Sequence, residues 1–581
     1  MLELSELSFH IPKDGESFPL LDQISLKIPT GHFMAIVGPS GCGKTTLLKT
    51  IAGINPESGG SLSYKGRDLA EEGDFEPHEI GYVPQFSVAY DELTVDESVE
   101  AAANLRIKSY SNADLDARLD RILTETGLTK IADRSVKVLS GGQKRRLGLA
   151  MELVSSPKLL LCDEVTSGLD PRSEREIVHL LHDLSRKDER TVISVTHSLA
   201  HLELYDSILV LHEGKVAYHG PPKDLSHYFS VEDTEEIYPT LSKQPSDNWR
   251  SSWSKHRDHY ENRMVANQKT NKSTSIEEPS GEEENPENEN ETAETIVKTP
   301  GFFTQTSTLL SRRTRIFLRD KGQIILQLAL IIGFPLLVSL FSSRANEQSQ
   351  RLSNTIEENK IEELINRAEV RASQLKVGSA NSGIIMFQVV LLCLMGSNNA
   401  AREVAAERNI FEKEKFGGVS PLSYLCSKLL FLTVLVLLQS LWMGLFVEIF
   451  WEFKGNFVNH LVFLVLVNAA MTSVCLGISA LAKNAEQASL LSIYLVGFQL
   501  PLSGAVLALP EVIEPLSRPF IAAYWAWSGA VDSLDTDKFS AIKAVTETTL
   551  STTNNCLYLL VAHLIIGLVA TFIGLQKPRW D

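Results

Sequence analysis

The chain has 581 residues and a formal net charge of −17, and it is too long to fold around one hydrophobic core. Nine glutamates lie between Glu277 and Glu294 with no basic residue among them. Much of the negative charge therefore belongs to one segment rather than to a surface for a basic partner. The six cysteines have no spacing typical of disulfide or metal sites. The N-terminus lacks the features of a signal peptide, so we expect the first domain to stay in the cytoplasm.

A phosphate-binding loop is predicted near the start of the chain. The apolar run 33–37 leads into the pattern G-x-x-x-x-G-K-T, and a helical segment follows it. In this pattern, backbone N–H groups wrap a triphosphate, the lysine reaches its β and γ phosphates, and the threonine hydroxyl binds Mg²⁺. The positive end of the following helix also favours the triphosphate. The residues predicted to bind ATP here are Gly38, Pro39, Ser40, Gly41, Cys42, Gly43, Lys44, Thr45 and Thr46.

Two acids follow a second apolar run, at residues 159–162. A strand buried on both faces would deliver both carboxylates to a ligand crevice at its carboxyl end. We expect Asp163 to be linked to Mg²⁺ and Glu164 to polarise the attacking water as the general base. The alternative is that these acids only cap a following helix.

Gln85 and His197 also follow short apolar strands, where their polar tips could reach the γ phosphate. Gln85 is in addition a candidate ligand of Mg²⁺. A histidine at a strand end is more often structural. The order of the motifs along the chain nevertheless favours catalytic roles for Gln85, Glu164 and His197.

This order of motifs resembles that of an ABC-transporter ATPase over residues 1 to about 225. The resemblance rests further on the run Leu139-Ser-Gly-Gly-Gln and on the D-loop that ends at Asp170. In that family two ATPase domains sandwich ATP head to tail, and the signature of one copy faces the phosphate loop of the other. One copy of each motif therefore implies a dimer, most simply of identical chains. The signature residues expected to bind ATP with Asp170 are Ser140, Gly141, Gly142 and Gln143.

The sequence departs from the family pattern at two places. Val165 stands where proline usually follows the catalytic glutamate, which should alter the turn more than the chemistry. The aromatic residue that stacks on adenine has no clear counterpart, because Ile11 takes its place with Phe9 and Phe18 nearby. The adenine contact is therefore unassigned.

Six apolar runs lie between residues 322 and 575, and most are long enough to cross a bilayer of about 30 Å. A buried soluble core is the alternative. The basic residues gather on one side of the predicted spans, which favours a membrane domain. The predicted fold is an α/β P-loop NTPase domain followed by an all-α six-helix transmembrane domain, in the cell membrane with both termini cytoplasmic. The spans are expected near 323–342, 383–400, 422–447, 458–482, 486–507 and 556–575.

Composition also predicts the domain boundaries. The ATPase domain is expected at 1–235, and an acidic, largely disordered linker at 236–298. An amphipathic interfacial helix is expected at 299–321 and the transmembrane domain at 322–581, with a long external insert at 343–382. A charged helix over 401–416 is expected to transmit the motion of the ATPase domain.

The order of ATPase first and six spans second is similar to that of the G-subfamily ABC half-transporters. The resemblance implies a cavity on a two-fold axis, lined by the second and fifth spans, through which apolar or amphipathic compounds leave. The matching candidates here are Phe387 and Gln388 with Phe498 and Gln499. Intramembrane amides are often functional, yet they also serve as hydrogen-bonding contacts between helices.

The resemblance implies an ATP-hydrolysing exporter or lipid translocase that uses ATP and Mg²⁺. The alternative is a membrane ABC ATPase that transmits force or a signal to an envelope partner, which the external insert would suit. A soluble ATPase that acts on nucleic acid would need two ATPase domains and basic surfaces, and this chain has neither. The expected partners are a second half-transporter, the lipid bilayer and the transported compound, with no nucleic acid.

Overall fold

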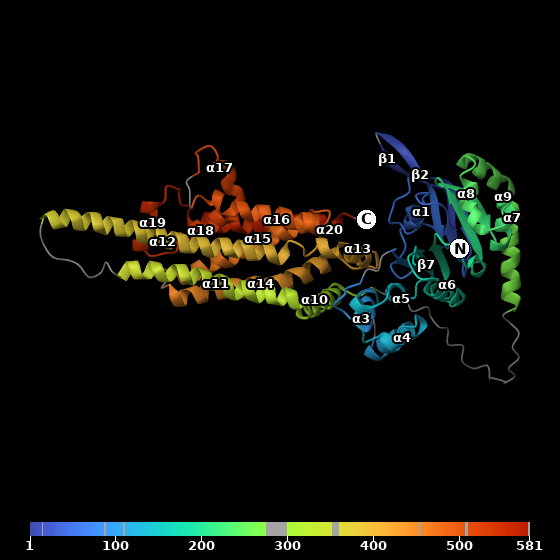
Figure 1. Ribbon diagram of the computed structural model, residues 1–581, viewed down its shortest axis with the longest axis horizontal. Helices are drawn as coiled ribbons and strands as arrows, with labels where there is room; N and C mark the ends of the chain where they lie inside the picture. The colour runs from blue at the N-terminus through green and yellow to red at the C-terminus, as the bar shows by residue number, and fades with distance from the viewer. Residues whose placement is uncertain are drawn as a thin grey trace. The chain divides into compact units, whose positions relative to one another are not determined.

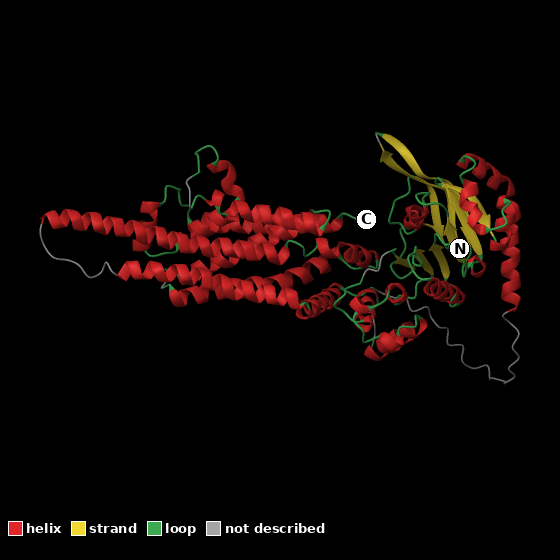
Figure 2. Ribbon diagram, in the orientation of Figure 1, coloured by secondary structure: helices red, strands yellow, loops and turns green. Residues whose placement is uncertain are grey.

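The chain forms two compact units in the computed structural model, which describes residues 1–13, 15–85, 89–108, 111–274, 299–350, 360–451, 455–505 and 509–578. The first unit comprises Met1–Thr304 with Phe416–Val419, and the second comprises Gln305–Lys415 with Ser420–Asp581. Among the described residues, all named strands lie in the first unit, as Figure 2 shows in yellow.

The first unit is built on two sheets (Figure 1). One has four strands in the order β2-β1-β4-β5, and the other has six in the order β10-β9-β3-β8-β7-β6. The strands are β1 (Leu2–Lys13), β2 (Glu16–Ile28), β3 (Phe33–Val37), β4 (Gly59–Tyr64), β5 (Arg67–Asp68), β6 (Ile80–Val83), β7 (Leu159–Asp163), β8 (Thr191–Val195), β9 (Ser207–His212) and β10 (Lys215–Gly220).

The centre of the six-stranded sheet is parallel and fully buried. Strand β3 pairs in parallel with β8 and β9, and β7 pairs in parallel with β8 and β6. All residues of β3, β7 and β8 are buried, as expected for parallel strands covered on both faces. Because parallel strands end at the same edge, the segments that follow β3, β7 and β8 meet there.

Helices occupy much of the remainder of the first unit, and Figure 1 labels most of them. They are α1 (Lys44–Ile51), α2 (Leu69–Glu72), α3 (Val95–Arg106), α4 (Asn112–Glu125), α5 (Gly141–Leu153), α6 (Pro171–Arg186), α7 (Leu225–Phe229), α8 (Ile237–Leu241) and α9 (Ser246–Thr274).

Part of the predicted linker is ordered, which corrects the expected boundary at residue 236. Helices α8 and α9 cover much of residues 237–274. Trp249 and Trp253 are buried, and the Trp249 indole donates a hydrogen bond to the carbonyl of Leu241 at 3.1 Å. These aromatic side chains supply the apolar area that the acidic stretch lacks. The acidic stretch at 275–298 lies outside the described residues.

The second unit is helical throughout its described residues, and its long helices lie side by side in Figure 1. The helices are α10 (Phe302–Arg319), α11 (Lys321–Gln350), α12 (Lys360–Ala400), α13 (Arg408–Phe416), α14 (Pro421–Phe450), α15 (Phe457–Leu481), α16 (Ala485–Gln499), α17 (Glu514–Ser517), α18 (Ala522–Asp532), α19 (Thr536–Val545) and α20 (Thr553–Gln576).

Five helical segments of the described chain are long and apolar enough to cross a membrane. They belong to α11, α12, α14, α15 and α20, and they correspond to five of the six predicted spans. The remaining predicted span, 486–507, contains α16, which has 15 residues and is therefore about 22 Å long. This length falls short of a bilayer core of about 30 Å. The count of six spans stays a prediction.

Carboxamide side chains connect four of these helices inside the second unit. Gln327 of α11 donates to Asn399 of α12 at 3.1 Å, and Asn399 donates to Gln439 of α14 at 2.8 Å. Gln439 donates back to Gln327 at 2.9 Å, which closes a ring. Asn468 of α15 joins it by donating to Gln439 at 3.2 Å. Buried amides that satisfy one another in this way hold apolar helices in register.

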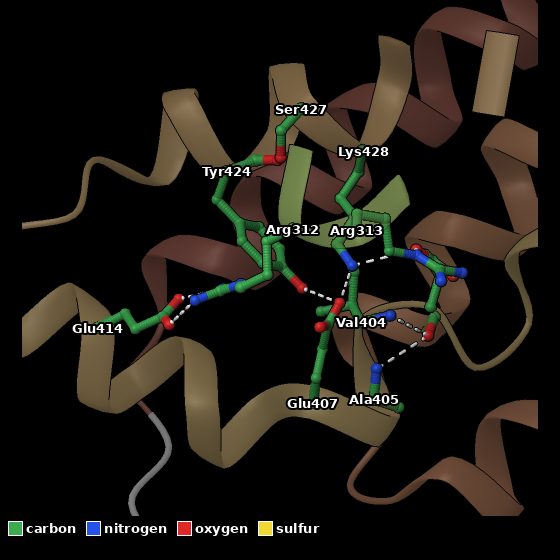
Figure 3. A network of polar contacts seen from close by, with 11 residues as sticks. Arg312, Arg313, Val404, Ala405, Glu407, Glu414, Tyr424, Ser427 and Lys428 are labelled. Carbon is green, nitrogen blue, oxygen red and sulfur yellow. Dashed lines mark hydrogen bonds and ion pairs between the residues drawn. The ribbon is translucent and has the colours of Figure 1, made fainter. Parts of the chain in front are cut away.

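A network of buried ion pairs ties α10 to the segment 403–416 and to α14 (Figure 3). Arg312 forms a two-pronged pair with Glu414, with 2.8 Å between Nη2 and Oε2. Arg313 pairs with Glu403 at 2.6 and 2.8 Å. Lys428 of α14 reaches Glu403 at 3.0 Å and also contacts Glu407.

The charged segment 401–416 is helical over a shorter range than the sequence predicts. The helix α13 begins only at Arg408, after a short 3₁₀ turn at Ala405–Glu407. The guanidinium of Arg408 donates to the carbonyls of Gly574 and Lys577 at 2.9 and 2.6 Å, so it caps the end of α20. Several charges of the segment are therefore buried within the second unit.

The pair Arg312–Glu414 provides a test of this network. Both side chains are about one-tenth exposed, so removing one partner leaves a buried charge without its counter-ion. We expect Arg312→Leu and Glu414→Leu each to lower the free energy of unfolding by about 3–5 kcal/mol. The double variant should recover most of this loss, because it buries no unpaired charge. Thermal unfolding of the purified full chain measures all three, and equal losses that simply add in the double variant would contradict the prediction.

Candidate functional site

The phosphate loop follows β3 and leads into α1, as the sequence predicts. Gly38 has a φ of +152°, and a Cβ there would lie 2.4 Å from the carbonyl oxygen of Leu211. Only glycine therefore fits at this position. Gly43 precedes α1 with a φ of +102°. The loop thus leads directly into the N-terminus of α1, where backbone N–H groups favour an anion.

Lys44 folds back over the loop that precedes it. Its ammonium group donates to the carbonyls of Gly38 and Pro39, each at 2.9 Å, and the residue is 4% exposed. Burial lowers the pKa of Lys44, while Cys42, Glu164 and Asp163 act in the opposite direction. Burial also raises the pKa of the Cys42 thiol. A triphosphate in the loop would give the Lys44 charge a direct counter-ion.

Asp163, at the end of β7, lies next to the first turn of α1. The hydroxyl of Thr45 donates to its Oδ1 at 3.0 Å, and the hydroxyl of Tyr82 in β6 donates to its Oδ2 at 3.2 Å. Burial raises the pKa of this carboxyl above its usual range. A hydroxyl and a carboxylate at this distance match the oxygen ligands that Mg²⁺ prefers. Two of the three predicted metal ligands, Thr45 and Asp163, are therefore brought together, whereas the amide of the third, Gln85, bonds to Glu164.

The side chains of Glu164, Gln85 and His197 meet at the same edge of the sheet. The Gln85 amide donates to Glu164 Oε2 at 2.7 Å, and His197 Nε2 lies 2.6 Å from Glu164 Oε1. Glu164 has a φ of +49°, an uncommon conformation for a residue other than glycine, and its N–H donates to the carbonyl of Val195 in β8 at 3.1 Å. Two of the three predicted catalytic residues thus contact the carboxylate of the third.

The signature residues lie at the start of α5 and form a capping box. The backbone N–H of Gln143 donates to the Ser140 hydroxyl at 3.3 Å, and the N–H of Ser140 donates to the Gln143 side chain at 3.0 Å. Ser140 and Gly141 are exposed, and Gly142 is half-buried. In the described part of the chain, the side-chain hydrogen bonds of Ser140 and Gln143 are made with each other, and none joins the phosphate loop.

Asp170 is exposed and caps α6. Its carboxylate accepts a hydrogen bond from the N–H of Ser173 at 3.0 Å, and its pKa is lowered first by its hydrogen bond with the Ser173 side chain. The structure therefore gives Asp170 a local role as a helix cap. The contact of Asp170 with ATP stays a prediction, because the hydrogen bonds described for Asp170 are local to its own helix.

Two features of the first unit escaped the sequence analysis. Tyr82 holds Asp163, although it lies only three residues before Gln85 in the run Gly-Tyr-Val-Pro-Gln. Glu152 is fully buried and forms a two-pronged pair with Arg106 at 2.7 and 2.9 Å. No spacing along the chain signals either contact, because both join segments more than 40 residues apart.

The four residues predicted to line a substrate path differ in their surroundings. Phe498 is 58% exposed, and Phe387 is half-buried. The side-chain amide oxygen (Oε1) of Gln499 accepts a hydrogen bond from the backbone N–H of Ala523 at 3.0 Å, next to the start of α18. Gln388 is 1% exposed, and its carbonyl oxygen has no hydrogen-bond partner among the described residues. Gln388 therefore differs from the amide ring of Gln327, whose members satisfy one another.

Two protein-family models match different parts of the chain. Residues 21–167 match the family described as ABC transporter, and residues 304–526 match the family described as ABC-2 type transporter. The first match covers the phosphate loop, the signature and both acids. The second begins two residues into α10 and ends within α18.

Curated relatives match over different lengths. The chain is 29% identical to the ABC transporter ATP-binding/permease protein Rv1747 of Mycobacterium tuberculosis, over 90% of this chain and 56% of that protein. It is 37% identical to the sulfate/thiosulfate import ATP-binding protein CysA of Mycobacterium bovis, over 36% of this chain and 59% of that protein. The chain thus spans less than two thirds of the length of these relatives.

Among solved structures, a dimeric bacterial ABC transporter cassette is 27% identical. The comparison covers 38% of this chain and 99% of that chain, with a TM-score of 0.36.

Proposed function

Because the chain joins an ABC transporter ATPase domain to an ABC-2 type transporter membrane domain, we propose that it hydrolyses ATP to export or translocate an apolar or amphipathic compound. The observation that carries the proposal is the meeting of Lys44, Asp163, Glu164, Gln85 and His197 at one sheet edge. Five long apolar helices in the same chain give the ATPase a membrane domain to drive.

Glu164 is the general base in this proposal. Its carboxylate accepts from the Gln85 amide and lies 2.6 Å from the His197 ring, so both of its oxygens are held in place. A water near this carboxylate would lose a proton to it as it attacks the γ phosphate. His197 and Gln85 then orient the carboxylate and contact the transferred phosphoryl group.

Thr45 and Asp163 are the residues that would hold Mg²⁺. Their oxygens lie 3.0 Å apart, and both are of the kind that Mg²⁺ takes beside phosphate oxygens. The ion, when bound, neutralises charge on the phosphates as it develops. Lys44 contributes a second positive charge at the loop.

The exposed signature supports the proposal of a dimer. The start of α5 offers a positive helix end, and in the described part of the chain the side-chain hydrogen bonds of Ser140 and Gln143 do not reach the phosphate loop. We propose that a second, identical chain brings its phosphate loop to this surface. Each ATP would then lie between the phosphate loop of one chain and the signature of the other.

The buried side-chain oxygen of Gln388, which has no hydrogen-bond partner among the described residues, is a candidate to bind a polar group of the transported compound. An unpartnered carbonyl oxygen deep among apolar helices costs about 1–3 kcal/mol, and a hydroxyl or amide of an amphipathic compound would satisfy it. The other predicted amide, Gln499, already accepts a backbone hydrogen bond. We therefore assign the polar contact to Gln388.

A second candidate function rests on the length of two helices. Helix α12 has 41 residues and α11 has 30, which corresponds to about 60 Å and 45 Å against a bilayer core of about 30 Å. Such extensions suit an ATPase that transmits force or a signal to an envelope partner without moving a compound.

One experiment tests the proposed function. The full chain in lipid nanodiscs is assayed for ATP hydrolysis against a panel of lipids and amphipathic compounds, with Glu164→Gln as the blank. We expect one class of compound to stimulate hydrolysis, and Glu164→Gln to lower the rate at least 100-fold because it lacks the general base. A flat response to every compound, with hydrolysis still dependent on Glu164, would favour the second candidate.

A pair of glutamine variants locates the contact. Gln388→Leu should raise the concentration of compound that gives half-maximal stimulation by about fivefold or more, since it removes one hydrogen bond of about 1 kcal/mol. Gln374→Leu makes the same change at an exposed position of the same helix and should leave that concentration unaltered. Equal behaviour of the two variants would remove Gln388 from the path.

A further inference from the structure

Tyr238 of α8 lies beside the candidate ATP site, although it is about 40 residues beyond the last predicted catalytic residue. Its hydroxyl donates to the backbone carbonyl of His197 at 3.3 Å. The backbone N–H of Gly38 and the thiol of Cys42 are close enough to the same hydroxyl to influence its pKa. One hydroxyl therefore bonds to the loop after β8 and lies next to the loop after β3.

The position of these two loops explains why one side chain can reach both. Strands β3 and β8 are parallel neighbours, and the N–H of Thr196 donates to the carbonyl of Ile36 at 3.1 Å. Gly38 and His197 therefore leave the sheet at the same edge. A tyrosine hydroxyl can donate one hydrogen bond and accept others, so Tyr238 can hold both backbones at once.

The contacts of Tyr238 connect residues on both sides of the site. Lys44 donates to the carbonyl of Gly38, and the N–H of Gly38 lies close to the Tyr238 hydroxyl. Tyr238 donates to the carbonyl of His197, and the His197 ring contacts Glu164 at 2.6 Å. This series of contacts runs from the lysine of the phosphate loop to the carboxylate that we propose as the general base.

We propose that Tyr238 is a positioning residue for ATP hydrolysis, which sets the phosphate loop and His197 in register through Gly38 and the His197 carbonyl. The inference rests on the proposed ATPase activity and extends it to a segment that the sequence analysis had placed in the linker. Tyr238 makes neither contact through its aromatic ring, so the hydroxyl alone carries the effect.

The segment that bears Tyr238 is firmly built into the first unit. The carbonyl of Leu241, at the end of α8, accepts the indole N–H of Trp249 at 3.1 Å, and Trp249 and Trp253 are buried. The helix that carries Tyr238 is thus anchored to an aromatic cluster. A shift of α8 would move the register between Gly38 and His197.

Tyr238→Phe removes the hydroxyl and keeps the ring. We expect kcat for ATP hydrolysis by the full chain in nanodiscs to fall roughly three- to tenfold, as the loss of one hydrogen bond of ordinary strength implies. The KM for ATP should stay within about twofold, because the phosphate loop itself still binds the nucleotide. Loss of kcat without loss of binding is the mark of a residue that aligns the reacting groups.

Tyr228→Phe is the matched control. The hydroxyl of Tyr228 donates to Ser252 at 3.2 Å, within the same C-terminal segment, and among the described residues it makes no hydrogen bond to the loops after β3 and β8. This variant should keep the kcat of the parent chain, and both variants should unfold at the same temperature as each other.

Three outcomes are distinguishable. The inference is overturned if Tyr238→Phe matches Tyr228→Phe in kcat, or if its lower activity comes with an equally lower unfolding temperature. Failure of the parent chain to show any hydrolysis that depends on Glu164 overturns the proposed function, and the inference falls with it. A kcat loss confined to Tyr238→Phe, at unchanged KM and unfolding temperature, supports it.

Discussion

The parallel pairing of β3, β8 and β7 is the constraint on which the candidate site depends. These three strands are wholly buried, and their shared direction places the phosphate loop, His197 and the acids at one edge. Thr45 and Asp163, 118 positions apart in the chain, thereby come within hydrogen-bond distance. Side chains such as Tyr82 and Tyr238 then fix the arrangement by contacts to Asp163 and to the backbone.

The second unit depends on polar contacts in an apolar setting. A ring of amides joins α11, α12 and α14, and buried ion pairs join α10 to α14 through the segment 403–416. Apolar side chains alone would pack against lipid as readily as against another helix, whereas hydrogen bonds and ion pairs distinguish one register from the others. These contacts therefore specify how the helices pack within this unit.

The sequence predicted the nucleotide site more fully than the rest of the chain. An apolar strand precedes each of its parts, namely the phosphate loop, the acid pair, Gln85 and His197. Because parallel strands end at the same edge of the sheet, that pattern predicts that these parts lie close together. Tyr238 had no such pattern, because its role depends on where α8 returns to the sheet. The ordered part of the predicted linker was missed for a related reason. The linker was predicted from its charged composition, whereas Trp249 and Trp253 form a buried cluster only in the folded chain. In the second unit, periodicity located the long helices but not the ion pairs of α10, whose Arg312 is buried against Glu414 rather than exposed.

The central claim is that each ATP is bound by the phosphate loop of one chain and the signature of another. It is tested most directly by mixing two inactive chains, one with Lys44→Ala and one with Gly141→Asp, under different affinity tags. A Cβ at Gly141 makes only an ordinary contact with Leu169 at 3.5 Å, so the second change adds charge without strain. In mixed dimers one site contains both lesions and the other contains neither. The account predicts that doubly tagged dimers regain ATP hydrolysis that both parent proteins lack, and mixed dimers as inactive as their parents would contradict it.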